Sequence, residues 1–260
     1  MKAVILAGGL GSRLSEETSV VPKPMVMIGH KPILWHIMKI YSKYNINDFI
    51  VCCGFKKEVI YNYFINYANN NSTIQIDIKN NNLLIYKNNS EPWTITLVDT
   101  GEDTATGGRL SMIKEYVSSE DCFCMTYGDG LSNIDIDSLI RFHRKNNKLV
   151  TVTAVLPPAR FGSLILSEDY LVKKINEKIY SNSISNNYIN GGFFVISPNA
   201  LDYIQDEKTA WELEPLSAIS NLMEMVAYIH DGFWHPMDTL KDKNILTNLW
   251  NNNVAPWKIW

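Results

Sequence analysis

The chain opens with Met1-Lys2-Ala3-Val4-Ile5-Leu6-Ala7-Gly8-Gly9-Leu10-Gly11-Ser12-Arg13-Leu14. An apolar run that ends in small residues predicts a buried parallel strand leading into a glycine loop. The backbone N–H groups of such a loop can face an anion, because no side chain covers them. A nucleoside triphosphate is the ligand that we expect there.

Two common glycine signatures do not fit this loop. The Walker loop ends in Gly-Lys followed by Ser or Thr, whereas this loop ends in Ser12-Arg13. The dinucleotide-binding fingerprint needs a third glycine and an acidic residue after the second strand. Here the second strand, expected over residues 48–53, leads into Gly54-Phe55-Lys56-Lys57. Both classes of site are therefore excluded.

The composition is that of an ordinary globular domain. The 260 residues are 46% hydrophobic and 20% charged, which is enough to bury one large core. A formal net charge of -3 gives no general attraction to nucleic acid or to an anionic membrane. With no signal segment and no run of about 18 apolar residues, we expect a cytoplasmic protein. The cysteine pairs Cys52-Cys53 and Cys122-x-Cys124 lie in apolar runs and are expected to be buried thiols.

The remaining pattern predicts a single α/β domain. A helix over residues 33–44, a strand over 48–53 and a helix over 57–67 continue the first strand as a βαβα unit. Alternating apolar residues predict short strands with one wet face within residues 73–98. Further along, the chain predicts helix 106–117, strand 121–127, helix 136–145, strands 149–156, 170–175 and 188–195, a helix after Leu216 and strand 226–230. No repeat and no proline- or glycine-rich linker divides the chain.

Two aspartates and two cationic residues are the candidates for chemistry. Asp129, between two glycines, directly follows a predicted strand, where ligands gather in parallel sheets, and Asp238 precedes the last predicted helix. Taken singly, the first could be a turn residue and the second a helix cap. Arg13 can grip phosphate oxygens with two donors, and Lys23 lies between Pro22 and Pro24 in what we expect to be a stiff extended segment.

Several motifs along the chain together resemble those of the sugar-1-phosphate nucleotidylyltransferases. Residues 7–14 and Pro22-Lys23-Pro24-Met25 resemble the general signature of that family. The branch of the family that uses CTP is similar at Glu91-Pro92-Trp93, Asp99-Thr100-Gly101, Thr106-Gly107-Gly108-Arg109, residues 233–239 and Ala255-Pro256-Trp257-Lys258. The resemblance implies a Rossmann-like three-layer α/β/α fold with a mixed, mainly parallel central sheet and a small β-rich sugar-binding part.

The resemblance also implies a reaction and a set of site residues. The reaction is the transfer of a cytidylyl group from CTP to α-D-glucose 1-phosphate, giving CDP-glucose and pyrophosphate, with Mg²⁺ as cofactor, and CDP-glucose would feed deoxysugar or O-antigen synthesis. The implied catalytic residues are Arg13, Lys23 and Asp129, and the implied metal ligands are Asp129 and Asp238. The nucleotide would contact Leu6, Ala7, Gly8, Gly9, Gly11, Ser12, Arg13, Lys23, Thr106, Gly107, Arg109, Gly128 and Asp129. The sugar phosphate would contact Glu177, Lys178, Asn190, Gly191, Trp211 and Glu212.

Elementary chemistry agrees with parts of this assignment. Two carboxylates plus phosphate oxygens suit Mg²⁺, and in-line transfer at phosphorus depends on positioning and neutralisation of charge. Arg109 can in principle donate to O2 and N3 of cytosine, whereas uracil would oppose it with an N3–H. The sugar phosphate is already a charged nucleophile at neutral pH, so no general base is needed.

Some alternatives stay open. After Glu177-Lys178 the usual proline of the family is replaced by Ile179, so another sugar phosphate remains possible, as does UTP or dTTP. A nucleotide-binding regulator that has lost catalysis is a different class of function. We expect one domain, with residues 1–130 mainly binding nucleotide and residues 131–260 mainly binding the sugar phosphate and other subunits. The resemblance suggests a homo-oligomer, with a hexamer as one candidate.

Overall fold

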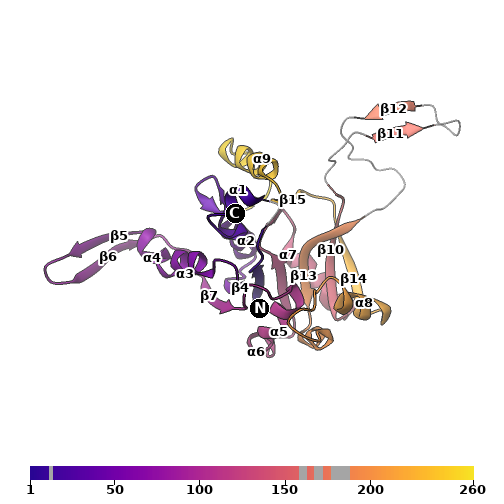
Figure 1. Ribbon diagram of the computed structural model, residues 1–260, viewed down its shortest axis with the longest axis horizontal. Helices are drawn as coiled ribbons and strands as arrows, with labels where there is room; N and C mark the ends of the chain where they lie inside the picture. Colours follow the sequence, from indigo (N-terminus) through magenta and orange to yellow (C-terminus); the bar gives the residue numbers. More distant parts are fainter. Residues whose placement is uncertain (12–13, 158–162, 167–171, 177–187) are drawn as a thin grey trace.

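A seven-stranded sheet forms the centre of the protein in this computed structural model, which describes residues 1–11, 14–157, 163–166, 172–176 and 188–260. The strand order is β14-β10-β13-β8-β1-β4-β7 (Figure 1). The strands are β1 (Ala3–Ala7), β4 (Asp48–Cys53), β7 (Thr94–Asp99), β8 (Phe123–Tyr127), β10 (Val150–Val155), β13 (Ile189–Ile196) and β14 (Met225–His230). Only β13 runs against its neighbours in this sheet, so the expected mixed, mainly parallel sheet is confirmed.

The opening strand occupies a central position in this sheet. β1 pairs in parallel with β4 on one side and with β8 on the other, and all five of its residues are buried. A strand buried on both faces explains the unbroken apolar run at the start of the chain. Because the carboxyl ends of parallel strands meet at one edge, the glycine loop after Ala7 lies beside the segment that follows Tyr127.

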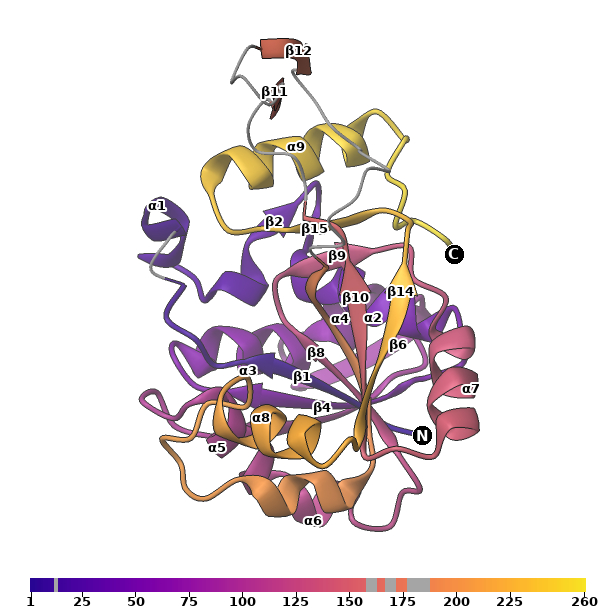
Figure 2. The same ribbon diagram turned by 90° about the vertical axis from the view of Figure 1, so that its right-hand side faces the viewer.

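Helices cover both faces of the sheet, which gives the expected three layers (Figures 1 and 2). Ala3, Ile5 and Ala7 face one core, and Val4 and Leu6 face the other, as alternation along a strand requires. The first core contains residues of α2 (Ile33–Ser42), α3 (Lys57–Ile65), α7 (Ile136–Asn146) and α9 (Leu240–Asn251). The second contains residues of α5 (Thr106–Met112), α6 (Lys114–Val117), η3 (Pro198–Tyr203) and α8 (Glu214–Asn221).

Within the described residues, four small two-stranded sheets lie outside the central one. They are β2 (Met27–Ile28) with β3 (Lys31–Pro32), β5 (Ser72–Asp77) with β6 (Asn82–Asn88), β9 (Gly130–Ser132) with β15 (Trp234–Pro236), and β11 (Ser163–Leu166) with β12 (Val172–Asn176). The β5–β6 hairpin follows α4 (Tyr67–Asn70) and projects from one side of the body in Figure 1. The β9–β15 pair joins segments that are far apart in sequence, and it matters for the site described below.

The structure departs from the sequence predictions in three places. Short strands with one wet face were expected within residues 73–98, but the β5–β6 hairpin is exposed on both faces, whereas β7 joins the central sheet. The helices expected over residues 57–67 and 106–117 are each broken near their carboxyl ends, at Asn66 and at Ile113. Lys23 lies in the 3₁₀ turn η2 (Lys23–Met25), so the expectation of an extended segment there was wrong.

No helix in the described part of the chain is long and apolar enough to cross a membrane. All four cysteines are free and buried, as the sequence predicts.

Candidate active site

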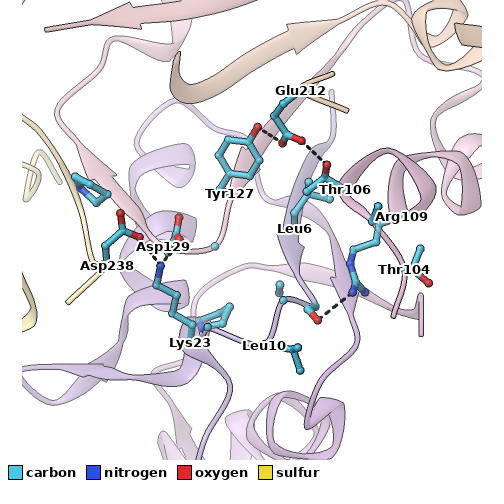
Figure 3. A pocket seen from close by; sticks show the side chains of 18 of the residues that line it. Leu6, Leu10, Lys23, Thr104, Thr106, Arg109, Tyr127, Asp129, Glu212 and Asp238 are labelled. Atoms are coloured by element: carbon cyan, nitrogen blue, oxygen red, sulfur yellow. Dashed lines mark hydrogen bonds and ion pairs between the residues drawn. The ribbon is translucent and has the colours of Figure 1, made fainter. Parts of the chain in front are cut away.

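A cleft of about 930 Å³ lies at the carboxyl edge of β1 and β8. This is near the upper end of the volumes that small-molecule sites occupy, so the cleft has room for more than one small ligand. Its walls come from the glycine loop, the turn with Lys23, the loop before α5 and the segments after β8 and β15 (Figure 3). The lining includes Leu6, Ala7, Gly8, Gly9, Leu10, Gly11, Lys23, Pro24, Thr106, Arg109, Tyr127, Gly128, Asp129, Asn190, Lys208, Glu212, Trp234, Pro236 and Asp238.

The side chain of Arg109 holds the glycine loop in place. One terminal nitrogen of its guanidinium donates to the Gly8 carbonyl (3.0 Å) and to the Glu102 carbonyl (3.1 Å). The other donates to Thr100 Oγ1 (2.6 Å) and to the Gly101 carbonyl (2.7 Å). The guanidinium lies so close to Gly8 that a Cβ there would be 2.0 Å from Arg109 Nη1. Arg109 therefore ties the glycine loop to the loop over residues 100–102.

The two candidate metal ligands are brought together by the β9–β15 pair. β9 begins directly after Asp129, β15 ends shortly before Asp238, and the antiparallel register places Gly130 opposite Pro236. A backbone hydrogen bond from Met237 N to Asp129 O (2.8 Å) closes this pairing. Two aspartates that are remote in sequence thus share one corner of the cleft, as the sequence predicts.

Lys23 reaches the same corner from the opposite wall. Its Nζ lies 2.6 Å from Asp129 Oδ2 and 2.8 Å from Asp238 Oδ1 (Figure 3). Gly128 permits this approach, because a Cβ there would meet Pro24 Cγ at 2.8 Å. Burial by itself lowers the pKa of Lys23, but the charges and hydrogen bonds of both aspartates outweigh it, so the pKa is raised and the ammonium stays charged.

A third group of polar residues in the cleft surrounds the carboxylate of Glu212. Its carboxylate accepts from Thr106 Oγ1 (2.6 Å) and from the hydroxyl of Tyr127, and the Asn190 amide lies 3.5 Å from that hydroxyl. Burial and the neighbouring Glu212 raise the pKa of Tyr127 well above its usual value. The phenol therefore remains a proton donor to Glu212 at any physiological pH.

The charge of the described lining indicates which ligands it can accept. Five carboxylates, of Glu102, Asp103, Asp129, Glu212 and Asp238, face only three cationic side chains in this part of the chain. A polyphosphate would be repelled by such a surface unless a cation came with it. No group of three or more His, Cys, Asp or Glu residues that could hold a metal ion occurs among the described residues. The pair Asp129 and Asp238 is thus suited to a metal whose remaining ligands are water and phosphate oxygens, as with Mg²⁺.

Not every predicted residue lines the cleft. Ser12, Arg13, Glu177 and Lys178, together with Ile179, lie outside the described residues. The Trp211 ring is fully buried in the second core, so a sugar cannot touch it in this arrangement. Gly107 and Gly191 act through the backbone: a Cβ on Gly107 would lie 2.6 Å from Thr209 O, and the Gly191 carbonyl accepts from Trp234 Nε1 (2.6 Å).

Some lining residues were not predicted from the sequence. Tyr127 directly precedes Gly128 and Asp129 at the strand end, so its position could have been inferred from the same rule that selected Asp129. Trp234 and Pro236 belong to the β15 motif that was recognised but given no role. No local sequence pattern predicts that Lys208 and the loop over residues 102–105 line the cleft. They reach it through contacts between loops that are distant in sequence, such as the hydrogen bond from Ala105 N to Glu207 O.

Comparison with known proteins gives consistent matches. Residues 2–242 match the Nucleotidyl transferase family. Over 260 residues the chain is 50% identical to glucose-1-phosphate cytidylyltransferase of Salmonella typhi, with all of both chains covered. It is 43% identical over 261 residues to the probable glucose-1-phosphate cytidylyltransferase of Bacillus subtilis, again with all of both covered. Among solved structures, HddC from Yersinia pseudotuberculosis aligns with a TM-score of 0.68 at 22% identity, covering 96% of this chain and 99% of that one, which supports the fold alone.

Proposed function

Because the chain belongs to the nucleotidyl transferase family, we propose that it transfers a cytidylyl group from CTP to α-D-glucose 1-phosphate. A phosphate oxygen of the sugar phosphate attacks the α-phosphorus of CTP, the bond to the β-phosphate breaks, and CDP-glucose and pyrophosphate leave. The observation that carries the proposal is the convergence of Lys23, Asp129 and Asp238 at the end of a glycine loop, joined to full-length identity of 50% with an enzyme of that name. CDP-glucose would feed deoxysugar synthesis for surface polysaccharide.

The aspartates would hold one Mg²⁺, which when bound supplies positive charge to the phosphates and polarises them. Asp129 and Asp238 present oxygen ligands from two different connecting segments. Because the described lining is net negative, a cation held by them would help the cleft to attract a polyphosphate. The backbone of Gly9, where nothing stands within 4 Å of the Cβ position, leaves room for phosphate oxygens to approach its N–H. Lys23 would neutralise the charge that develops between the two phosphate-bearing substrates.

The sugar would be bound near Glu212. The Glu212 carboxylate and the Asn190 amide both lie next to the Tyr127 hydroxyl, and they can accept hydrogen bonds from sugar hydroxyl groups and donate hydrogen bonds to them. Glu177 and Lys178, which the family resemblance also assigns to the sugar phosphate, stay predictions because they lie outside the described residues. Arg13 and Ser12 stay predictions for the same reason.

The base-reading role expected for Arg109 has little support from its contacts. Both terminal nitrogens donate to protein oxygens, and the residue is only 3% exposed. Reading O2 and N3 of cytosine would require two of these hydrogen bonds to be exchanged for bonds to the base. We propose instead that Arg109 shapes the nucleotide cleft by positioning the glycine loop.

The metal corner is tested by Asp129→Asn and Asp238→Asn, each of which keeps the side-chain volume and removes the charge. We expect pyrophosphate release from CTP and glucose 1-phosphate to fall by a factor of about a thousand or more, as is usual when a metal ligand or charge-stabilising group is lost. Near-normal release from either purified variant would overturn the assignment. CTP binding without any pyrophosphate release by the wild type, across a panel of sugar phosphates, would instead indicate a regulatory nucleotide-binding protein.

We also propose that the protein is a cytoplasmic homo-oligomer built from one domain. The central sheet draws strands from both halves of the chain, which supports one domain, and four free buried cysteines fit a reducing compartment. One face of the β5–β6 hairpin carries Ile76, Leu83 and Ile85, which are 60%, 43% and 47% exposed. An isolated two-stranded hairpin is marginal in water, so we expect a second copy to cover it, and light scattering should give a mass of at least twice 29.7 kDa.

A further inference from the structure

The ammonium of Lys23 occupies the place between the two carboxylates that a metal would need. Its Nζ donates to Asp129 Oδ2 and to Asp238 Oδ1, at 2.6 and 2.8 Å. The lysine is only 8% exposed, and the side chains of Asp129 and Asp238 are 30% and 13% exposed. These carboxylates therefore have a cationic partner inside the protein while the substrates are absent.

Electrostatics explains why such a partner is useful. Two carboxylates that both lie within 3 Å of one nitrogen are close to each other, and in a partly buried corner they repel each other strongly if no cation lies between them. Lys23 removes this repulsion and holds both side chains in the arrangement that the β9–β15 pair prepares.

The same contact creates a conflict when a divalent cation arrives. An ammonium and a divalent ion that share the same two carboxylates would stand side by side, and like charges a few ångström apart repel strongly. The lysine backbone is fixed in the 3₁₀ turn between Pro22 and Pro24, but its side chain also lines the cleft. Movement of the side chain alone can take the ammonium from the carboxylates to the space where phosphates would lie.

We propose that Lys23 is an internal counterion that exchanges with the metal: it holds Asp129 and Asp238 in the free enzyme, and it releases them to the metal when nucleotide phosphates offer the ammonium a new partner. This rests on the proposed function. The consequence is thermodynamic coupling between the binding of metal and the binding of nucleotide. Without nucleotide, the metal must displace the Lys23 ammonium from both carboxylates while no phosphate is present to bind it.

The experiment measures binding of Mn²⁺, used as a spectroscopic substitute for Mg²⁺, from the electron paramagnetic resonance signal of the free ion. Titrations are run on the full chain, with no nucleotide and with CTP, for the wild type and for Lys23→Met. Lys208→Met is the matched control, because Lys208 lines the same cleft while its ammonium donates to the Asp103 carbonyl.

Exchange predicts a specific pattern of affinities. Without nucleotide, Lys23→Met should bind Mn²⁺ at least about tenfold more tightly than the wild type, since one close positive charge is removed, while Lys208→Met should match the wild type. CTP should strengthen Mn²⁺ binding much more in the wild type than in Lys23→Met. Equal or weaker Mn²⁺ binding by Lys23→Met, or an equal gain in Lys208→Met, would overturn the exchange.

Two further measurements separate this inference from its premise. Thermal unfolding of Lys23→Met shows whether this variant is folded. If Lys23→Met is unfolded, the titrations use Lys23→Gln in its place, because glutamine keeps a hydrogen-bond donor for one carboxylate. If the wild type binds Mn²⁺ with CTP but the variants show no change in coupling, the exchange fails while the proposed function stands. If no form binds Mn²⁺ even with CTP, both the exchange and the metal site are wrong.

Discussion

Replacement of Gly8 by alanine should disrupt the glycine loop through one identifiable clash. The new Cβ would lie 2.0 Å from Arg109 Nη1 and 2.3 Å from its Cζ, about 1.4 Å short of the 3.4 Å at which ordinary contact begins. The guanidinium cannot retreat by that distance and keep hydrogen bonds of 2.6–3.1 Å to both loops. Loss of two such bonds from a charged donor, at about 1.5–3 kcal/mol each, predicts a loss of about 3–6 kcal/mol in the free energy of unfolding.

Gly9 provides a control in the same loop. Nothing lies within 4 Å of its Cβ position, so Gly9→Ala should be neutral or stabilise the fold by up to about 1 kcal/mol through the unfolded chain. Urea unfolding of both variants measures the difference, and the KM for CTP should rise for Gly8→Ala because the loop no longer holds its shape. A double-mutant cycle with Arg109→Ala should show a coupling of about 3–6 kcal/mol, the whole cost of Gly8→Ala, because the clash disappears with the guanidinium.

The explanation would be refuted by either of two results. Gly8→Ala and Gly9→Ala could prove equally stable, which would mean that the loop has room for the methyl group. Alternatively, the costs of Gly8→Ala and Arg109→Ala could simply add, which would mean that the two residues act independently. Circular dichroism before each titration ensures that the comparison concerns folded protein.

Further predictions concern pH, the sugar and the base. Burial lowers the pKa of His36 to about 4. Between pH 6.5 and 4 the unfolded chain therefore binds a proton at His36 that the native state does not bind. The contribution of neutral His36 to the free energy of unfolding is present above pH 6.5 and falls by about 2 kcal/mol between pH 7 and 5. In urea unfolding, His36→Gln should therefore lose less stability over that range than the wild type. Tyr127→Phe removes a donor to Glu212 and should raise the KM for glucose 1-phosphate about five- to tenfold with an unchanged KM for CTP; a change confined to CTP would contradict the proposed sugar side. Arg109→Ala should leave the ratio of CTP to UTP turnover within a factor of about three, and a fall in that ratio of tenfold or more would restore Arg109 as a reader of the base.

Local signals in the sequence predicted the central elements well. The limits of β1 and β4 agree with the apolar runs, because each strand is buried on both faces and turn-forming residues end it. The position of Asp129 follows from the same rule, since the carboxyl ends of parallel strands face one edge. The resemblance to a known family then supplied the metal-binding role of Asp238, whose position before the last predicted helix would by itself equally suit a helix cap.

What the sequence could not predict depends on pairing between distant segments. The partners of the Arg109 guanidinium are mostly backbone carbonyls, which every residue has, so no residue type reveals the clamp. The contact of Lys23 with both aspartates needs the β9–β15 register, which arises only when the two segments meet. Likewise, alternation predicted β5 and β6 as strands, but it could not show that most of their residues stay exposed on both faces.

The β9–β15 pair has a consequence for the order of events during translation. A nascent chain that has left the ribosome as far as the end of β9 already contains the glycine loop, Lys23 and Asp129. It contains neither the strand that pairs with β9 nor Asp238, so Lys23 has only one carboxylate to bind and the corner is incomplete. Domains generally fold from the amino terminus as they are made. Activity should therefore appear late in synthesis, and a premature stop before β15 should yield a fragment that cannot consume CTP.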